Sequence, residues 1–223
     1  MKHNDRFEQW EVQGERVMLR PWQCEGDSLA TSDLDAFVNL FDALPDDFGA
    51  NEAPRKRRWA DQWDYYCDPA DLLALGVGMN NRRDEALVAI EKSHLAMRMF
   101  RQFDYQQHID GDIYRAVVCE GEPVGIIWVG RDYGNRHIDG NLGCLIHPVH
   151  RKKGIGTEAV ALMVQGLFVH TDLTRLSVSV YAPDKASIRV LEKNGFTHEG
   201  TIRKAALHND EPVDILVYGK LRE

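Results

Sequence analysis

The fold is decided by the stretch Leu145-Ile-His-Pro-Val-His-Arg-Lys-Lys-Gly-Ile-Gly-Thr-Glu-Ala159. An apolar strand is expected to end at His147-Pro148, and three cations and a Gly-x-Gly turn follow it. Apolar residues then recur at helical spacing, at Ala159, Val160, Leu162, Met163 and Leu167. The stretch therefore predicts a strand that passes through a basic glycine turn into a helix.

The turn between this strand and this helix has the features of a phosphate site. Gly154 and Gly156 let the main chain turn tightly and approach a ligand, because glycine has no Cβ. The first amides of a helix lack internal acceptors and lie at its positive end, which favours bound phosphate. The Arg151 guanidinium can bind two oxygens at once. We therefore predict a diphosphate site formed by Arg151, Lys152, Lys153, Gly154, Ile155, Gly156 and Thr157.

Two familiar nucleotide motifs do not fit this turn. A P-loop requires a lysine directly after its second glycine, but Thr157 follows Gly156 here. A dinucleotide fingerprint requires a third glycine near Ala159. On this stretch alone, an ordinary strand-to-helix turn with a solvated basic rim is an equally good interpretation.

A second stretch, Asp184-Lys-Ala-Ser-Ile-Arg-Val-Leu-Glu-Lys-Asn-Gly-Phe196, follows after a β-rich segment. Together, Arg151-x-x-Gly-x-Gly156 and this helix, which opens with Asp184-x-x-Ser187, resemble the GNAT superfamily of acetyl-CoA-dependent N-acetyltransferases. The run Gly195–Arg203 and the closing Asp214-Ile-Leu-Val-Tyr218 look like the branch that acetylates ribosomal-protein N-termini, the RimJ/RimL type.

The resemblance covers residues 113–221 and, more loosely, 14–21, and it implies one domain over residues 1–223. The implied fold is α/β: a mixed, mostly antiparallel sheet of about seven strands with helices on both faces. An enlarged helical segment, 46–111, is expected to wall the acceptor pocket. The implied cosubstrate is acetyl-CoA, with no metal. In the family, the strand before the glycine turn splays from its neighbour beside the pantetheine arm, and Leu145 and Ile146 hold the matching positions.

The composition narrows the class of partner. Lys and Arg number 27 against 35 Asp and Glu, a net charge of −8, which argues against a general DNA- or RNA-binding protein. The four cysteines lack a Cys-x-x-Cys pair, which is typical of a reduced chain. The sequence shows no apolar stretch of membrane-spanning length, and its first residues do not look like a signal peptide. We expect a cytoplasmic protein without a membrane or DNA partner, and homodimer formation stays open.

Hydrophobic patterns predict the other elements. Strands are expected at Val17–Leu19, Tyr114–Cys119, Val124–Val129, Ile138–Ile146, Arg175–Ala182, Gly200–Leu207 and Val213–Leu221. Gly140 and Gly143 indicate a bulge or a close backbone approach within the strand before the turn.

Four helices are expected. One is capped by Ser32 and Asp33 and has Leu34, Phe37, Leu40 and Phe41 on one face, and a second runs over about residues 84–103. A third runs from the glycine turn to about His170, and a fourth runs from the Asp184 cap to Asn194-Gly195. The basic run Arg55–Arg58 is more typical of a solvated helix face than of an RNA contact.

Acetyl transfer from a thioester requires a neutral amine and a proton for the leaving thiolate. An α-amine is roughly a tenth neutral at pH 7 and a lysine side chain far less, so an N-terminal acceptor depends less on a strong general base. In the family this base is a Glu before a glycine of the central strand, where this chain has Asn141. Asp139 lies on the same strand face and is the candidate base, directly or through a water, with an ordinary edge carboxylate as the alternative. His137 and His147 are weaker candidates.

The proton donor also departs from the family. Most members use a tyrosine on the second helix, where this chain has Leu191. The RimL-like branch points instead to Ser187, near the cofactor sulfur, although the spacing from Asp184 is also that of a helix cap. Asp184 replaces the usual asparagine and lacks its amide donor. The candidate catalytic residues are Asp139 and Ser187, and the candidate cofactor-binding residues are Leu145, Ile146, residues 151–157, Asp184 and Ser187.

Other chemistries fit less well. Cys144, His147 and His150 are spaced by threes, which places strand residues on alternate faces, so we expect no metal site. A serine hydrolase would need Gly-x-Ser-x-Gly, which the sequence lacks.

The sequence therefore indicates an N-acetyltransferase that moves an acetyl group to a primary amine by direct attack in a ternary complex. The acceptor is either a protein N-terminus or a small amine such as an aminoglycoside, a polyamine or an amino acid. A non-catalytic acyl-CoA-binding module is an alternative, because Asn141 and Leu191 replace the usual catalytic groups. A ribosome or RNA contact through Arg55–Arg58 is a third.

Overall fold

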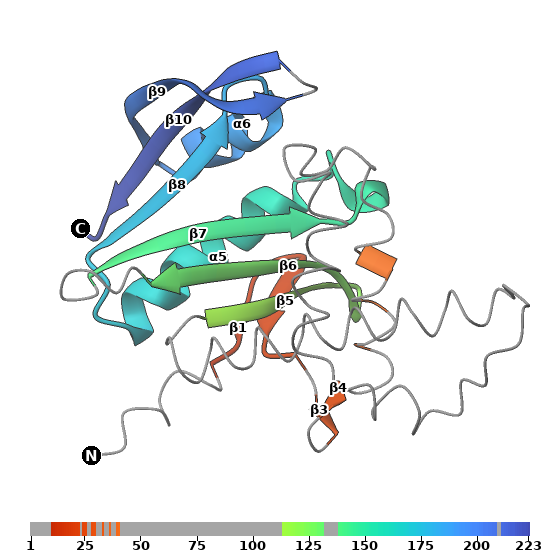
Figure 1. The fold of residues 1–223 in the computed structure, drawn as a ribbon. Coiled ribbons are helices and arrows are strands. Elements are labelled where there is room, and N and C mark those ends of the chain that lie inside the picture. The colour runs from red at the N-terminus through yellow and green to blue at the C-terminus, as the bar shows by residue number, and fades with distance from the viewer. Residues whose placement is uncertain are drawn as a thin grey trace, which may run out of the picture.

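The computed structural model describes residues 10–22, 24–25, 28–29, 33, 36, 39–40, 113–131, 138–208 and 211–223. The expected helix at 84–103, the 46–111 segment with Arg55–Arg58, and His137 lie outside the described residues. Within them, eight strands form one sheet in the order β1-β2-β5-β6-β7-β8-β10-β9 (Figure 1). The expected count of about seven omitted β1, which is too short to show a hydrophobic pattern.

The first part of the sheet is antiparallel. It consists of β1 (Val12–Gln13), β2 (Val17–Arg20), β5 (Ile113–Cys119), β6 (Glu122–Arg131) and β7 (Asp139–Ile146). A two-residue turn joins β5 to β6, and both of its residues have positive φ angles, as a tight hairpin requires. A separate short hairpin, which the sequence did not predict, is formed by β3 (Cys24–Glu25) and β4 (Ser28–Leu29).

The second part of the sheet consists of β8 (Arg175–Tyr181), β10 (Glu211–Leu221) and β9 (Thr197–His208). Among the described strand pairs, only β7 and β8 are parallel, and helix α5 (Ile155–His170) connects them. Their pairing covers just three positions, Asp139–Asn141 with Arg175–Ser177. Beyond these positions the two strands diverge (Figure 1). The expected splay is therefore present, and we call the gap between Leu142–Ile146 and Val178–Tyr181 the wedge.

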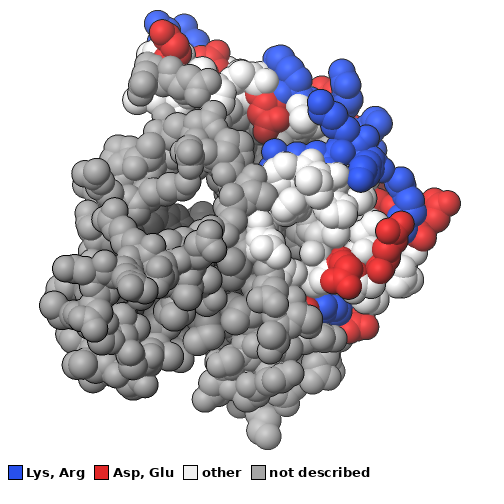
Figure 2. Space-filling view, turned by 90° about the vertical axis from the view of Figure 1, so that its right-hand side faces the viewer, with Lys and Arg blue, Asp and Glu red and all other residues white. Residues whose placement is uncertain are grey.

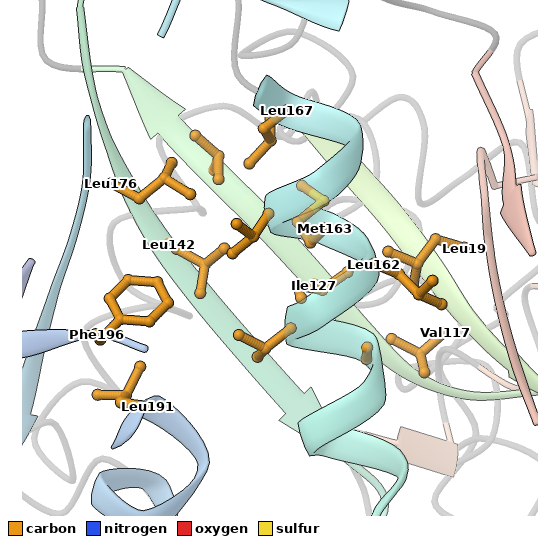
Figure 3. Close-up of a cluster of buried hydrophobic side chains, with 14 of the residues drawn as sticks. Leu19, Val117, Ile127, Leu142, Leu162, Met163, Leu167, Leu176, Leu191 and Phe196 are labelled. Atoms are coloured by element: carbon orange, nitrogen blue, oxygen red, sulfur yellow. The ribbon is translucent and has the colours of Figure 1, made fainter. Parts of the chain in front are cut away.

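Helices α5 and α6 (Lys185–Lys193) pack on the same face of the sheet. Ala159, Val160, Met163 and Leu167 of α5 share one buried cluster with residues of β2, β5, β6 and β7, and α6 adds Ile188 and Leu191 (Figure 3). Helix α6 buries one apolar face, whereas α5 is buried on most of its sides, with Leu162, Val164 and Gly166 buried as well. Apolar residues at helical spacing predicted both helices correctly. Of the helix expected after Ser32, the described residues Asp33, Ala36, Asn39 and Leu40 are helical, and Leu40 is buried.

Two details differ from the sequence-based expectation. The pairing of β6 with β7 runs without a register shift from Arg131↔Gly140 to Gly125↔Ile146, so no bulge lies at the glycines. Gly143 instead makes room for the Trp128 ring, which a Cβ at that position would overlap. Asp33, expected at a helix cap, is buried, and its carboxylate accepts hydrogen bonds from both terminal nitrogens of Arg20, at 2.7 and 2.8 Å. In the described part of the chain, no helix has the length and apolar character needed to cross a membrane.

Candidate functional site

The strand-to-helix turn is built as the sequence predicted. β7 ends at Ile146, a short 3-10 helix, η2 (Pro148–His150), follows, and α5 begins at Ile155. Lys152 and Gly154 have φ angles of 61° and 84°. For a lysine this left-handed conformation costs about 1 kcal/mol, and strain of this kind often accompanies functional loops.

The described residues leave the main-chain amides of this turn without acceptors. The first hydrogen bond at the start of α5 runs from the Glu158 N–H to the Gly154 carbonyl, at 3.0 Å. Within the described part of the chain, the main-chain N–H groups of Lys152–Thr157 have no protein acceptor. Together with the positive end of the helix, they form a set of donors suited to an anion.

Arg16 and Glu158 fix the turn from the β1–β2 side. Arg16 Nη1 donates to the Lys153 carbonyl at 2.8 Å, and Arg16 Nε donates to Glu158 Oε2 at 3.2 Å. Glu158 Oε1 accepts from the main-chain N–H groups of Arg16 and Val17, at 2.8 and 3.1 Å. The C=O and N–H of a trans peptide point in opposite directions, so the bond to the Lys153 carbonyl turns the Gly154 N–H away from Arg16.

The Glu158 carboxylate is stabilised in its ionised form. Burial acts to raise its pKa, but the hydrogen bonds from the Arg16 and Val17 amides and the Arg16 guanidinium outweigh burial and hold the pKa below its ordinary value. Sequence reasoning missed this pair, because the two residues lie 142 positions apart. The only local signal was an acidic residue in the first turn of the predicted helix.

The two glycines of the turn have different roles. A Cβ on Gly154 would lie 2.8 Å from Arg16 Nη2, and its φ of 84° disfavours other residues. Among the described residues, a Cβ on Gly156 would meet only Ile146 Cγ1, at 3.5 Å, an ordinary contact. The protein therefore requires a glycine at Gly154, whereas the space at Gly156 is open for a ligand.

Helix α6 lies against the start of α5. Asp184 caps it as predicted, with Oδ1 accepting from the Ser187 N–H at 3.0 Å. The Ser187 hydroxyl makes no hydrogen bond in the described part of the chain. At the other end, Asn194 Nδ2 donates to the carbonyls of Thr157 and Val190, at 3.1 and 2.8 Å. A pocket of about 570 Å³ adjoins this junction, lined among others by Gly154, Thr157, Glu158, Lys193 and Asn194.

Asp139 lies at the closed end of the wedge. Its Oδ2 is 3.4 Å from Arg175 Nε, and Arg175 also forms two hydrogen bonds to the Glu199 carboxylate of β9. Glu199 reaches over Gly219 of β10, where a Cβ would collide with it. The hydrogen bond from Arg175 lowers the pKa of Glu199 and raises that of Arg175. The sequence did not predict that Asp139 belongs to a network tying β7, β8 and β9 together.

The other candidate residues differ in their burial and in their position relative to the wedge. Leu145 and Ile146 lie on the part of β7 that borders the wedge, while Asn141 is exposed. Leu191 is 3% exposed and packs near Phe196 in the core (Figure 3). Burial raises the Cys144 pKa to about 12, so its thiol is protonated near neutral pH. Burial, His150 and Arg151 lower the pKa of His147. Among the described residues, no three His, Cys, Asp or Glu side chains form a possible metal site.

A sheet that splits at a parallel strand pair, beside a helix whose first amides are free, defines the fold of the GNAT acetyltransferases. The sequence matches the family described as acetyltransferase (GNAT) domain over residues 16–197. The chain belongs to this family, as the sequence motifs predicted.

Two curated relatives come from Bacillus subtilis (strain 168). The chain is 32% identical to the uncharacterized N-acetyltransferase YoaA over 83 residues, which are 37% of this chain and 47% of the relative. It is 43% identical to the probable N-acetyltransferase YjcK over 63 residues, which are 28% of this chain and 35% of the relative. The chain thus spans less than half the length of these two relatives.

Solved structures share the fold over nearly the whole chain. The ribosomal-protein-S5-alanine acetyltransferase from Vibrio fischeri has a TM-score of 0.64 at 17% identity, covering 96% of this chain and 97% of that one. The microcin C7 self-immunity acetyltransferase MccE, solved with acetyl-CoA and AMP, has a TM-score of 0.63 at 14% identity, covering 94% of each chain. RimL, the ribosomal L7/L12 α-N-protein acetyltransferase, solved with coenzyme A, has a TM-score of 0.60 at 16% identity, covering 95% and 98%.

Proposed function

We propose that this protein is an acetyl-CoA-dependent N-acetyltransferase that transfers the acetyl group directly to a primary amine in a ternary complex. The observation that carries the proposal is the set of N–H groups of Lys152–Thr157, which have no acceptor among the described residues and lie next to the wedge between β7 and β8. Family membership supports the choice of cosubstrate. We assign the diphosphate to residues 151–157 and the pantetheine arm to the wedge edge at Leu145 and Ile146.

The proposed reaction is a single displacement. The amine nitrogen attacks the thioester carbonyl, a C–N bond forms, the C–S bond breaks, and the thiolate leaves. The attacking nitrogen loses a proton, and the thiolate gains one. We assign the accepting role to Asp139, directly or through a water, and the donating role to the free hydroxyl of Ser187. The Asp184 carboxylate caps α6. Because a carboxylate has no amide group, this side chain cannot donate an amide hydrogen bond to the pantetheine arm.

A protein N-terminus is the acceptor that we favour. An α-amine is roughly a tenth neutral at pH 7 and so depends less on a strong base, which suits a site with Asn141 in place of the usual Glu. Two of the similar structures, the one from V. fischeri and RimL, are ribosomal-protein acetyltransferases, which supports the same choice. Small amines are the alternative acceptors, and an acyl-CoA-binding module without turnover is the alternative function.

Calorimetry with acetyl-CoA tests the cosubstrate, and release of free thiol in the presence of N-terminal peptides, polyamines and aminoglycosides tests turnover. We expect binding below tens of micromolar and thiol release with peptides. Binding without thiol release from any amine would favour the non-catalytic module, and absence of binding would overturn the proposal.

Replacement of Asp139 and Ser187 tests the assigned catalytic roles. We expect Asp139→Asn and Ser187→Ala to lower kcat by about 100-fold each, with little change in KM for acetyl-CoA. The matched control is Glu199→Gln, which weakens the same Arg175 network without changing Asp139. If Glu199→Gln lowers kcat as much as Asp139→Asn does, Asp139 has only a structural role.

A further inference from the structure

One arginine connects the closed end of the wedge to the far edge of the sheet. Arg175 of β8 lies opposite Asp139 in the short pairing of β7 with β8. Its Nε lies 3.4 Å from Asp139 Oδ2. Its Nη1 donates to Oε1 of Glu199 at 2.7 Å, and its Nη2 donates to the other oxygen of the same carboxylate. Each nitrogen of the guanidinium therefore faces a carboxylate oxygen.

The orientation of this guanidinium is fixed by a carboxylate from another part of the sheet. Glu199 reaches Arg175 by lying across Gly219 of β10, where a Cβ would collide with it. A guanidinium that binds one carboxylate through both terminal nitrogens is held in a defined plane, which the single ammonium of a lysine cannot reproduce. The position of Nε relative to Asp139 is thus set by a residue of β9, three strands away from β7.

Glu199 also balances the charge of Arg175. The hydrogen bond to Glu199 is the largest influence on the pKa of Arg175 and raises it, ahead of the contribution of Asp139. The same hydrogen bond lowers the pKa of Glu199, so both groups stay ionised and form a pair without net charge. Among the described residues, no second cation forms an ion pair with Asp139. Arg175 can therefore orient the Asp139 carboxylate without adding an uncompensated positive charge that would repel a proton.

The two oxygens of the Asp139 carboxylate have different surroundings. Oδ2 faces Arg175, whereas Oδ1 is buried and accepts no hydrogen bond from the described residues. A buried carboxylate oxygen without a donor is costly and uncommon, so it calls for an explanation. Asp139 lies at the closed end of the wedge, on the same strand face as Asn141. An oxygen left without a donor at this place is available to accept a proton.

We propose that Arg175 is a positioning residue that holds Asp139 Oδ2, so that Oδ1 accepts the proton that the attacking amine loses. This inference rests on the proposed function, in which Asp139 is the base. The proton passes from the amine nitrogen to Oδ1, directly or through a water, as the C–N bond forms and the C–S bond breaks. Arg175 keeps its own protons and acts only through Asp139, while Glu199 holds the guanidinium in its plane.

A double-mutant cycle on kcat tests the proposal. Thiol release from acetyl-CoA with an N-terminal peptide is measured for Arg175→Gln, for Asp139→Asn and for the two substitutions combined. We expect Arg175→Gln alone to lower kcat about tenfold with little change in KM for acetyl-CoA, because a misplaced base slows the reaction without weakening cosubstrate binding. In the Asp139→Asn background, the same substitution should change kcat by less than about twofold, since no base is left to position.

Two further variants separate positioning from stability. Arg175→Lys keeps the positive charge but loses the paired hydrogen bonds to Glu199, so we expect kcat to fall about threefold to fivefold, and again only when Asp139 is present. This variant also carries the cycle if Arg175→Gln does not fold. The matched control is Arg222→Gln, because Arg222 is half-buried and its Nη2 donates to the Thr171 carbonyl at 2.6 Å. We expect this control to lower the Tm and to leave kcat unchanged.

The outcomes separate the two levels of inference. If the wild type releases no thiol with any amine, the proposed function fails. If the wild type is active and Asp139→Asn keeps its kcat, the base is wrongly assigned and the role of Arg175 falls with it. If Arg175→Gln lowers kcat equally in both backgrounds, or in neither, the function stands and the positioning role is wrong. A loss of kcat in Arg222→Gln as large as in Arg175→Gln would trace both losses to stability and would also overturn the proposal.

Discussion

At the scale of single residues, Gly154 and Gly156 look alike in the sequence but differ in what requires them. Gly154 adopts a left-handed φ beside Arg16, whereas Gly156 has only an ordinary contact within reach of a Cβ. The motif therefore combines one glycine that the main chain needs with one that the described residues around it do not require.

This difference predicts opposite effects of substitution. Gly154→Ala is expected to lower the free energy of unfolding by about 1–2 kcal/mol, because alanine is strained at positive φ. Gly156→Ala should leave it unchanged or raise it by up to about 1 kcal/mol, because alanine is the better helix former, while Gly156→Glu should prevent acetyl-CoA binding by filling the open space with a negative charge. Urea unfolding and calorimetry measure the two effects. If Gly154→Ala and Gly156→Ala destabilise the protein equally, the two glycines do not have the different roles that we assign to them.

Glu158 provides a prediction about pH. Its pKa in the folded protein lies below the ordinary value of 4.5, so its stabilising effect is present above that pH and is lost as the pH falls through the folded-state pKa. Glu158→Gln should therefore be less stable than the wild type by about 1–2 kcal/mol at pH 7, and the difference should shrink below pH 4.5. Thermal unfolding across this range tests it, with the exposed Glu122→Gln as the control. If the stability difference between the wild type and Glu158→Gln does not change with pH, the ionisation of Glu158 is not its cause.

At the scale of elements, the position of α6 against α5 decides which side chains lie beside the glycine turn. Both ends of α6 are held by side chains: Asp184 caps its start, and Asn194 bonds to the Thr157 carbonyl in the first turn of α5. Side chains also hold the closed end of the wedge. Only three positions of β7 and β8 are paired there, and beside them Arg175 binds the carboxylates of Asp139 from β7 and Glu199 from β9.

Removal of the Asn194 side chain should loosen the junction. Asn194→Ala deletes two half-buried hydrogen bonds, and we expect a loss of about 1–2 kcal/mol in the free energy of unfolding. We also expect weaker acetyl-CoA binding, because the start of α5 and the end of α6 would no longer be held together. Thr197→Ala, at a nearby exposed position, is the control. Unchanged affinity in a destabilised Asn194→Ala protein would show that the junction serves stability alone.

At the scale of the whole molecule, charge is distributed unevenly. The chain has a net charge of −8, yet Lys and Arg side chains gather on one side of the view in Figure 2. The net charge alone therefore misrepresents the surface that an anionic ligand meets.

The uneven charge predicts a salt effect on binding. Raising KCl from about 50 mM to about 500 mM should weaken acetyl-CoA binding roughly tenfold, because exposed charges are screened within a few ångströms at high salt. S-acetylpantetheine, which lacks the phosphates, should bind weakly but with little dependence on salt. Calorimetry at the two salt concentrations measures both. An affinity for acetyl-CoA that does not change with salt would contradict a charge-based site.

Much of the fold follows from local pattern. The bounds of α5, the Asp184 cap, the end of α6 at Asn194-Gly195 and most strands agree with the sequence-based prediction, because each is set by residues within a few positions of one another. The glycine turn was predictable for the same reason. β1 and the β3–β4 hairpin were missed because two-residue strands carry no period.

By itself, the sequence determined the order of elements, the family and the residues of the glycine turn, since periodicity, caps and glycines act over short distances along the chain. Only the tertiary structure decided that Arg16 holds the Lys153 carbonyl, that Arg175 engages Asp139, and that Asn194 ties the end of α6 to the start of α5. These contacts join strands and helices from distant parts of the chain. A hydrogen bond between residues 142 positions apart leaves no local pattern, because it exists only after the sheet has brought both ends together.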